Sequence, residues 1–378
     1  MAKRFYITIL MLLVCLTFIG ESALGQIIFA GKSGTINGYF MPYFQSWEMK
    51  SEENTENVSQ FSMPLFVNLR PTENLRFWFA DSFSATSLDK GDDGSVSLTG
   101  LSDAKAKASY SMFDRKFLIT LGANFPIGKE KLNEDEFDVA NILYKELLGF
   151  RVNKLGSGFD INSGLAYATS FGPWGLSLSS NYLLRGSYEN TDGKDTKYKP
   201  GNEIGVVTSL DMVTDTFIFN GNIGYIHYGN DQVDDGDSFK EGDEIKARLM
   251  ATYRLSPIAV ILSVADTIRM KNQIPDANSD LIAEDENSHG NKLDTNILLQ
   301  YLIARNFSVS PTAGMTFVAD NGYGENGAFI WNVGGVIQYL PAKNIVVNLN
   351  TRYLMGNMNS GDLDLSGFET GLVLIGRF

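Results

Sequence analysis

Large apolar residues alternate with polar or small residues along most of this chain. In the stretch 173–188, tryptophan, leucine and tyrosine share one face, whereas glycine, serine, asparagine and arginine share the other. The stretches 327–340 and 345–357 repeat this pattern. A period of two predicts β-strands with one apolar and one wet face. At about 12 to 15 residues, such strands exceed the usual five or six of a globular sheet.

Tight turns and longer polar connections separate the predicted strands in strict alternation. The segments 71–74, 305–306 and 341–344 are among the tight turns. This arrangement is typical of a bacterial outer-membrane barrel, which has short periplasmic turns and longer extracellular loops. A soluble β-solenoid is disfavoured, because no repeat of 20 to 50 residues is visible. We expect strands near 34–49, 58–70, 75–87, 102–113, 116–127, 158–171, 173–188, 201–214, 216–230, 244–255, 257–270, 290–304, 307–320, 327–340, 345–357 and 364–378.

The predicted fold is all-β: a single transmembrane antiparallel up-and-down β-barrel of about 16 strands, with 14 as the alternative. Residues 1–25 have the features of a signal peptide, because Lys3 and Arg4 precede an apolar core that ends in small residues. A retained membrane anchor is the alternative. We expect the barrel to occupy residues 26–378 in the outer membrane of a Gram-negative-type bacterium, with both termini in the periplasm.

The last predicted strand ends in an aromatic residue. Phe368, Leu372 and Leu374 lie on the same face as the terminal Phe378. This ending resembles the C-terminal strand of bacterial outer-membrane barrels, where it serves as a signal for the barrel-assembly machinery. The resemblance implies two partners for this chain, the assembly machinery and outer-membrane lipid.

Several turn and strand-edge motifs carry a closer resemblance. They are Asn124-Phe-Pro-Ile-Gly128, Leu155-Gly-Ser-Gly158, Trp174-Gly-Leu176 and Tyr198-Lys-Pro-Gly201-Asn-Glu203. Together they are similar to the porin-like barrels of the meta-cleavage pathway of phenol degradation, over roughly a third of the mature chain. Members of that family are thought to pass small, often hydrophobic, compounds, which is what the resemblance implies about the solute. No ligand-binding residue of the family maps onto this sequence.

The composition limits the chemistry that the chain can perform. A formal charge of -13 over 378 residues disfavours nucleic acid as a partner, because binding to phosphates needs a basic surface. The one cysteine, Cys15, lies in the predicted signal peptide, and the two histidines, His227 and His289, accompany no nucleophile motif. The acidic stretch 231–243 fails the spacing of a calcium-binding loop. We therefore expect no enzyme activity, no metal and no cofactor.

The acidic residues concentrate in the predicted outer loops. These loops carry a combined formal charge of -16, and the rest of the chain after residue 25 carries +2. A nearly neutral barrel with an acidic extracellular rim follows from this distribution. The predicted outer loops are 50–57, 88–101, 128–157, 189–200, 231–243, 271–289, 321–326 and 358–363.

Charged residues also occur within the predicted strands, on the polar face. A lysine or arginine on the lipid face costs roughly 2 to 4 kcal/mol at mid-membrane, so we expect this face to line a wet lumen. If the hairpins fold symmetrically, Arg185 lies opposite Glu203 and Arg352 lies opposite Glu369. These pairs either fix the strand register or contact a solute. The pore-lining candidates are Arg76, Lys105, Lys107, Arg185, Glu203, Lys246, Arg248, Arg254, Arg352 and Glu369.

The third outer loop, 128–157, contains a predicted helix of about four turns. Asn133 and Glu136 form a plausible capping box, and Gly149 stands at the expected helix end. Phe137, Ala140, Tyr144 and Leu147 share one helical face. This helix resembles in position the inward-folded third loop of general porins. One hypothesis is that it narrows the pore, with Glu134, Asp135 and Asp138 facing the constriction; the alternative is a helix over the barrel mouth or packed on the wall.

A sixteen-stranded barrel is wide enough for an aqueous channel unless something fills it. The first interpretation is an outer-membrane channel that passes small-molecule solutes by passive diffusion, with selectivity set by pore width and luminal charges. The alternatives are a non-conducting structural or surface-interaction barrel and a transporter for hydrophobic compounds.

Overall fold

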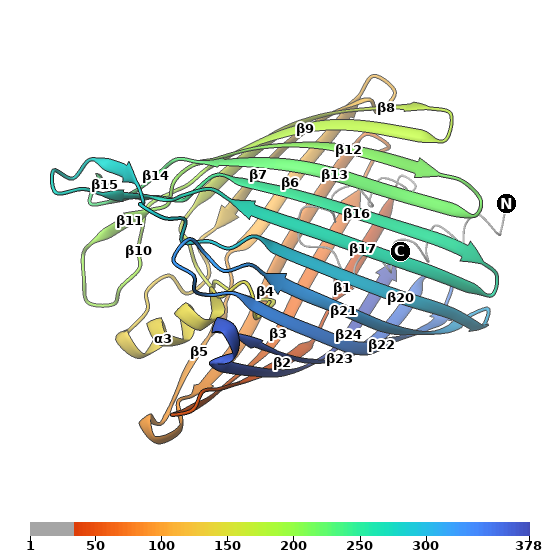
Figure 1. Cartoon of the computed structure of the whole chain (residues 1–378). Coiled ribbons are helices and arrows are strands. Elements are labelled where there is room, and N and C mark those ends of the chain that lie inside the picture. The colour runs from red at the N-terminus through yellow and green to blue at the C-terminus, as the bar shows by residue number, and fades with distance from the viewer. Residues whose placement is uncertain (1–33) are drawn as a thin grey trace.

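The structure is a computed structural model that describes residues 34–378, and the predicted signal peptide, 1–25, lies outside them. Within the described range, one antiparallel sheet closes on itself as a barrel (Figure 1). Each strand pairs with its neighbours in sequence, and the last strand pairs with the first. The predicted all-β barrel of 16 strands is therefore confirmed.

Fourteen of the barrel strands are continuous, and each of the other two consists of two segments, which gives the 18 segments of the sheet. The interrupted strands are β1 (Thr35–Phe40) with β2 (Tyr43–Lys50), and β5 (Ser95–Leu101) with β6 (Ala104–Met112). The continuous strands are β3 (Thr55–Arg70), β4 (Leu75–Asp89), β7 (Phe117–Phe125), β8 (Asp160–Phe171), β9 (Trp174–Leu184), β12 (Glu203–Val213), β13 (Phe217–Tyr228), β16 (Glu244–Leu255), β17 (Ile258–Arg269), β20 (Lys292–Ala304), β21 (Phe307–Val318), β22 (Ala328–Ala342), β23 (Ile345–Met358) and β24 (Leu363–Arg377).

The two interruptions have different consequences for the prediction. Pro42 separates β1 from β2, because proline has no N–H to donate to the ladder, but both segments pair with β3 and β24. The expected outer loop 88–101 is wrong. Residues 95–101 form β5, which pairs with the end of β4. Only a 3-10 turn, η2 (Gly91–Asp93), remains at the tip of this hairpin.

The barrel wall has an apolar outside and a polar inside. Leucines such as Leu121, Leu165 and Leu178 are exposed on the outer face. The inner face instead carries buried amides and hydroxyls, among them those of Gln45, Gln60 and Thr86. Because successive side chains of a strand point to opposite faces, the period-two sequence pattern sorts residues directly into these two environments.

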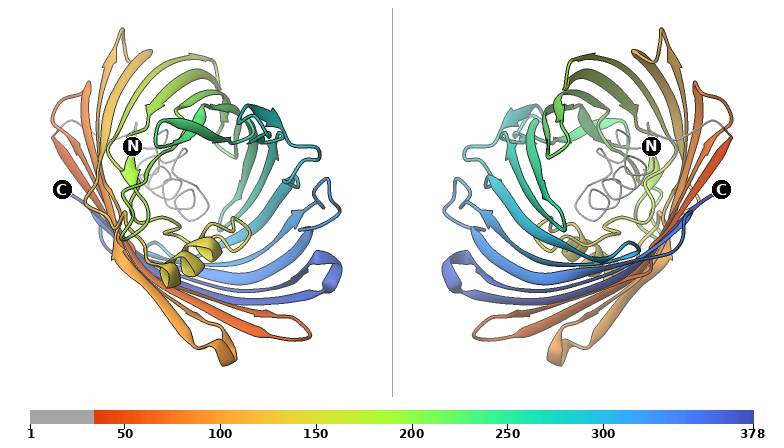
Figure 2. Two further views of the ribbon diagram at one scale, coloured as in Figure 1. Left: turned by 90° about the vertical axis from the view of Figure 1, so that its left-hand side faces the viewer. Right: turned by 90° about the vertical axis from the view of Figure 1, so that its right-hand side faces the viewer.

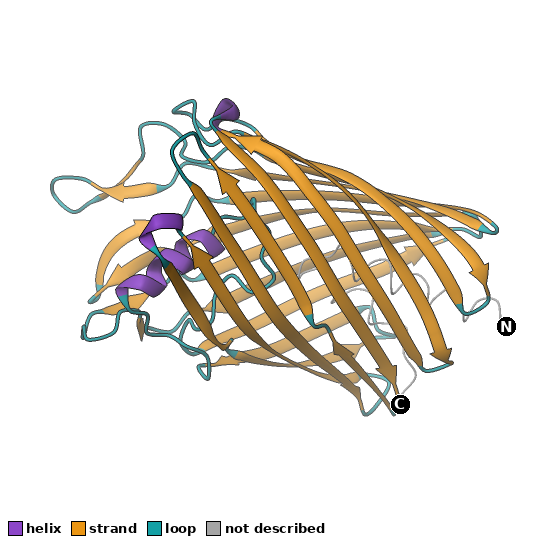
Figure 3. Cartoon of the chain, turned by 90° about the horizontal axis from the view of Figure 1, so that it is seen from below, coloured by secondary structure: helices purple, strands orange, loops and turns teal. Residues whose placement is uncertain are grey.

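The two ends of the barrel differ (Figure 3). Tight turns and the C-terminus lie at one end, and the long loops and the helix lie at the other. Three of the long loops pair with one another in a small second sheet that extends beyond the barrel. Its strands are β10 (Tyr188–Glu189), β11 (Lys197–Lys199), β14 (Asn230–Val233), β15 (Gly236–Lys240), β18 (Gln273–Pro275) and β19 (Leu281–Ala283).

Across residues 34–378, no helix has the length and apolar character needed to span a membrane.

The helix of the third loop begins as expected but ends early. The side chain of Asn133 accepts from the Glu136 N–H, and the Glu136 side chain accepts from the Asn133 N–H, which confirms the capping box. The helix, α3 (Glu134–Leu143), has ten residues, so the expected four turns are wrong. After Leu143 the chain turns inward instead of continuing the helix.

The buried face of α3 also differs from the expected one. Val139, Ala140, Ile142 and Leu143 are buried, whereas Tyr144 is exposed. Of the predicted face, Ala140 alone is fully buried, because the barrel wall approaches the helix from an adjacent side. Gly149 has a positive φ of 61°, but it serves the turn beyond the helix and not the helix end.

Candidate functional site

The ten pore-lining candidates lie at inner-face positions of the barrel wall. In the ladder between β4 and β6, Lys105 pairs with Ala80, and Lys107 pairs with Trp78. Arg352 pairs with Glu369. Arg76 and Arg254 lie near the end with short turns, whereas Arg185, Glu203 and Lys246 lie near the end with long loops. The inner wall therefore carries charge along its whole length.

The expected pair on the last hairpin forms an ion pair that also closes the barrel. Arg352 Nε donates to Glu369 Oε2 at 2.9 Å, and the hydroxyl of Tyr43, on the first barrel strand, donates to the same oxygen at 2.5 Å. Glu369 is almost fully buried, at 4% exposure. This carboxylate links β23 and β24 to β2 across the seam between the last and first strands.

The second expected pair belongs to a larger group. The Arg185 side chain forms an ion pair with Glu203, and its Nη1 atom also lies 3.1 Å from Asp160 Oδ2. Asp160 is fully buried and accepts a further bond from the amide of Asn124. One arginine thus holds together β8, β9 and β12 at the end of the barrel with the long loops, a structural task that its charge and fork geometry suit.

Both ends of the third loop meet at one inward-pointing carboxylate. Asp103, at the break between β5 and β6, accepts from the Gly128 N–H at 3.1 Å and from the Ser157 N–H at 2.7 Å. A Cβ on Gly128 would lie 2.3 Å from the carbonyl oxygen of Leu155, so only glycine fits there. The two motifs Asn124–Gly128 and Leu155–Gly158, distant in sequence, form this single junction.

From that junction the loop runs down the inner wall, held by side chains that bond to its backbone. The carbonyl of Leu148 accepts from Gln45 Nε2 at 2.6 Å and from Trp47 Nε1 at 2.9 Å. Gln60 pairs with Val152 as a neighbouring strand would: its amide donates to the Val152 carbonyl at 2.7 Å and accepts from the Val152 N–H at 3.1 Å. Segment 148–152 is therefore a fixed part of the lumen.

An apolar cluster inside the barrel reinforces these bonds. The loop contributes Val139, Ile142, Leu143, Leu148 and Phe150, all buried. They pack on wall residues of β2 to β5 and of β22 to β24. Figure 2 shows α3 at the barrel mouth, close to the wall made by the first and last strands. Each fully buried side chain of this kind contributes roughly 1.5 to 3 kcal/mol, so the cluster is a strong attachment. The wall residues are Trp47, Met49, Val58, Leu88, Leu98, Ile330, Leu354 and Leu365.

The tip of the loop reaches a second part of the wall. Glu146 forms an ion pair with Arg269 at the end of β17, and its carbonyl accepts from Lys292 Nζ of β20 at 3.3 Å. Burial is the largest effect and opposes ionisation of Glu146, but the charge and hydrogen bond of Arg269, together with the charges of Lys292 and Lys246, outweigh it. The pKa of Glu146 therefore lies below its ordinary value. Because Leu148 is held by β2, the tip bridges two wall regions six barrel strands apart.

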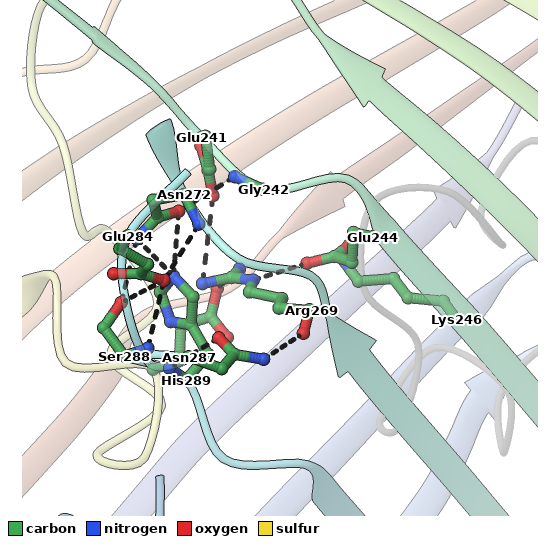
Figure 4. A network of polar contacts seen from close by, with 11 residues as sticks. Glu241, Gly242, Glu244, Lys246, Arg269, Asn272, Glu284, Asn287, Ser288 and His289 are labelled. Carbon is green, nitrogen blue, oxygen red and sulfur yellow. Dashed lines mark hydrogen bonds and ion pairs between the residues drawn. The ribbon is translucent and has the colours of Figure 1, made fainter. Parts of the chain in front are cut away.

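Arg269 is the centre of the network drawn in Figure 4. Its Nε atom donates to Glu244 Oε2 at 2.9 Å, and its Nη1 atom lies 3.8 Å from Glu241. Burial raises the pKa of Glu241 in spite of Arg269. Next to this centre, Asn272 accepts from the Gly242 N–H at 2.8 Å and so joins two long loops. The third, fifth and sixth outer loops are thereby linked around one guanidinium.

The acidic residues suggested for a constriction lie on α3, and not on the later segment of the third loop that folds along the wall. Glu134 and Asp135 occupy the exposed first turn of α3, where acids suit the helix dipole. Asp138 forms an ion pair with Lys90 in the β4–β5 hairpin. None of the three lines the cavity described next, and their role in a constriction stays a prediction.

A cavity of about 750 Å³ lies below the inward-folded segment. The loop contributes Gly149 to Lys154 to its lining. Met41, Phe66 and Trp78 line one side, and Lys246 and Arg248 line another. The lumen thus contains a space of the size of a small-molecule site. It is bounded on one side by the third loop, residues 128–157, which we call loop 3.

Sequence reasoning missed the residues of loop 3 that line this cavity, chiefly Arg151 and Lys154. The available signal was a charge contrast: residues 147–158 contain two cations and no acid, whereas 130–138 is acidic. It also missed Asp103 and Gln60. A polar residue on an inner face resembles any other lumen residue until its partner, about a hundred positions away, is known.

The chain matches no known protein family model, and no curated protein matches it. Its structure is similar to that of a deletion mutant of the monoaromatic hydrocarbon channel TodX, with a TM-score of 0.50 and 10% identity over 96% of this chain and 95% of that one. The high-pH structure of Pseudomonas putida OprB aligns with a TM-score of 0.47 and 10% identity, over 94% and 96% of the two chains. At such identity the likeness to TodX supports the barrel fold alone.

In the part of the chain from residue 34 onwards, no three His, Cys, Asp or Glu side chains are placed to hold a metal ion. Asp231 and Asp237, in the acidic stretch 231–243, instead accept hydrogen bonds from Tyr198 and Asn230.

Removing the two glutamines that hold loop 3 tests the attachment of segment 148–152. In a Gln45→Leu, Gln60→Leu variant, the backbone groups of Leu148 and Val152 lose their partners, each at a cost of about 1 to 3 kcal/mol. Amide hydrogen exchange of residues 148–155 is expected to accelerate at least about tenfold. Gln338→Leu, a buried inner-face glutamine near Ser308, is the matched control. Equal exchange in the three proteins would show that these bonds do not hold the loop.

The bridge at the tip is tested by Glu146→Ala. A spin label on Lys145→Cys, the one cysteine after residue 25, is expected to gain mobility when the Arg269 contact is lost. Glu241→Ala removes a longer contact to the same arginine and is expected to leave the label unchanged. Identical mobility in wild type and Glu146→Ala contradicts a fixed tip.

Proposed function

We propose that this protein is a passive channel for small solutes in a bacterial outer membrane. The observation that carries the proposal is a closed barrel with an apolar outer face, whose charged inner wall surrounds a loop-bounded cavity of about 750 Å³. Charged side chains on the inner wall fit a water-filled lumen, because buried unpaired charge is costly. Diffusion through such a lumen needs no chemical step, so the protein is not an enzyme in this account.

The same account gives the barrel its orientation. The end with tight turns faces the periplasm, and the end with long acidic loops faces outward. The C-terminal Phe378 lies at the periplasmic end, where its N–H donates to the Ile36 carbonyl at 2.8 Å. Its ring is 71% exposed on the outside of the barrel, which suits recognition by the barrel-assembly machinery before closure.

Two alternatives each have a specific observation in their favour. A non-conducting structural barrel is favoured by the tip of loop 3, which bridges β2 and β17. A channel for hydrophobic compounds is favoured by the apolar side of the cavity, formed by Met41, Phe66 and Trp78. We prefer a small-solute channel because the opposite side, with Lys246 and Arg248, is charged.

Conductance in planar lipid bilayers tests the proposal. The purified protein is expected to give discrete current steps, and deleting residues 132–148 is expected to raise the step size, because the deletion removes the bridge across the lumen. No steps at any voltage, with wild type and deletion alike, would exclude a channel. Steps of equal size in both proteins would leave the channel and exclude loop 3 as its constriction.

A pair of adjacent substitutions tests the membrane-facing surface. Leu178 is 52% exposed on the outside of β9, and Ser179 points into the lumen, where its hydroxyl lies near Val207. Leu178→Lys is expected to cost roughly 2 to 4 kcal/mol of folding free energy in a bilayer, whereas Ser179→Lys is expected to cost little. Urea unfolding in lipid vesicles measures both. Equal costs would mean that β9 does not present Leu178 to lipid.

A further inference from the structure

We infer that the cavity below loop 3 is a binding site for small organic anions that have an apolar, preferably aromatic, body. This inference rests on the proposed channel function and gives its solute class. It is carried by the placement of apolar and cationic groups around a single cavity, which would hold the two parts of such a solute at the same time.

The apolar part of the site lies on the wall of β1, β3 and β4. The rings of Phe66 and Trp78 lie 5.9 Å apart at an angle of 38°, next to Met41 and Pro64. Phe150 of loop 3 also lines the cavity. Flat aromatic groups pack favourably on such a surface in offset or edge-on arrangements.

The charged wall lies on the opposite side of the lumen. β3 is the second barrel strand and β16 the tenth, so half of the barrel separates them. On β16, Arg248 and Lys246 line the cavity, and Lys246 also forms an ion pair with Glu244. A solute that spans this space meets apolar carbon on one side and cations on the other, which favours amphipathic molecules over purely hydrophobic or purely polar ones.

Loop 3 adds two cations, Arg151 and Lys154, which lie against aromatic rings; Glu369 also acts on Arg151 through its charge. The Arg151 guanidinium carbon lies 4.5 Å from the centre of the Tyr43 ring, and Lys154 Nζ lies 5.1 Å from that of Tyr188. Among the described residues, no carboxylate lies within 4.0 Å of either cation. A partly buried cation such as Lys154 gains when an anion arrives.

The acids nearest to Lys154 already have partners. Asp160 binds Arg185 and Asn124, and Asp103 accepts from the backbone at the base of loop 3. Asp231 accepts from the Tyr198 hydroxyl. These engaged carboxylates leave the ammonium group of Lys154 available to a solute.

Other acids around the cavity are also accounted for. Asp294 accepts from Thr316 Oγ1 at 2.5 Å and lies 3.5 Å from Lys292. Asp81 accepts from the Ser82 N–H at 2.7 Å. Asp266 pairs in register with Ala247. Ala247 stands between the inward-facing Lys246 and Arg248, so the side chains of Ala247 and Asp266 lie on the other face of the sheet.

Burial and the charge of Arg185 lower the pKa of Lys154 to about 8. The carboxylates of Asp160, Asp103 and Asp231 partly offset this effect. The ammonium group of Lys154 is therefore charged below about pH 8 and loses its charge above it. Binding of anions through Lys154 should therefore weaken as the pH rises from 7 to 9.

The experiment measures block of single-channel KCl current by benzoate, with acetate, benzyl alcohol and benzylammonium as comparison probes. Benzoate is expected to block most strongly at pH 7 and about tenfold more weakly at pH 9. Lys154→Met is expected to remove this pH dependence, and Lys154→Arg is expected to retain strong block at both pH values. Lys145→Met, an equal charge change on an exposed part of loop 3, is the matched control.

The apolar surface has its own variants. Phe66→Ala is expected to bring benzoate block close to that of acetate while the K⁺/Cl⁻ preference stays unchanged, and Phe66→Leu checks that the barrel tolerates a change at this position. Current steps with equal block by all four probes, or with block unaffected by Lys154→Met, would overturn the inference and leave the channel intact. A protein without current steps would instead overturn the proposed function.

Discussion

The closure of the sheet is the constraint on which the rest of this structure depends. β24 pairs with β1 and β2, so every barrel strand has two neighbours and the barrel has no free edge. In an apolar solvent this closure is what satisfies the backbone of a sheet. It also creates an inside, and Tyr43, Glu369 and Arg352 join three strands at the seam from that inside. The sorting of residues into apolar-out and polar-in follows directly.

Within this closed wall, loop 3 behaves as part of the barrel. Asp103 holds both of its ends, Gln45, Trp47 and Gln60 hold its backbone, and an apolar cluster fixes its helix. The cavity is therefore bounded by the segment after α3, which carries Arg151 and Lys154.

The number of strands could be predicted because the two faces of a barrel impose a period of two that each strand shows on its own. The helix start could be predicted for a similar reason: Asn133 and Glu136 are three residues apart and cap each other locally. The strand at residues 95–101 was not predicted, because these residues are mostly small or polar and were assigned to a loop. In the structure they pair with β4. Residues 95–101 form a strand because β4 extends beside them and offers its backbone for pairing.

The candidate site could be predicted only in part. Arg185 and Glu203 were expected to meet because a hairpin relates them, but Asp160 joins them from the other neighbouring strand. The path of loop 3 depends on contacts such as that of Gln45 with Leu148, which are 103 positions apart. No local pattern shows such a contact. An inward-folded loop like that of general porins was expected. The apolar wall of β2 to β5 and β22 to β24 decides which face of this loop is buried and which meets the lumen.

The central claim is that solutes pass beside the inward-folded segment of loop 3. Chemical modification of Asn153→Cys during single-channel recording tests it most directly, because Asn153 lines the cavity and the chain has no other cysteine after residue 25. A bulky charged thiol reagent is predicted to reduce the current through an open channel in a single step. An unchanged current through fully labelled protein would contradict the account.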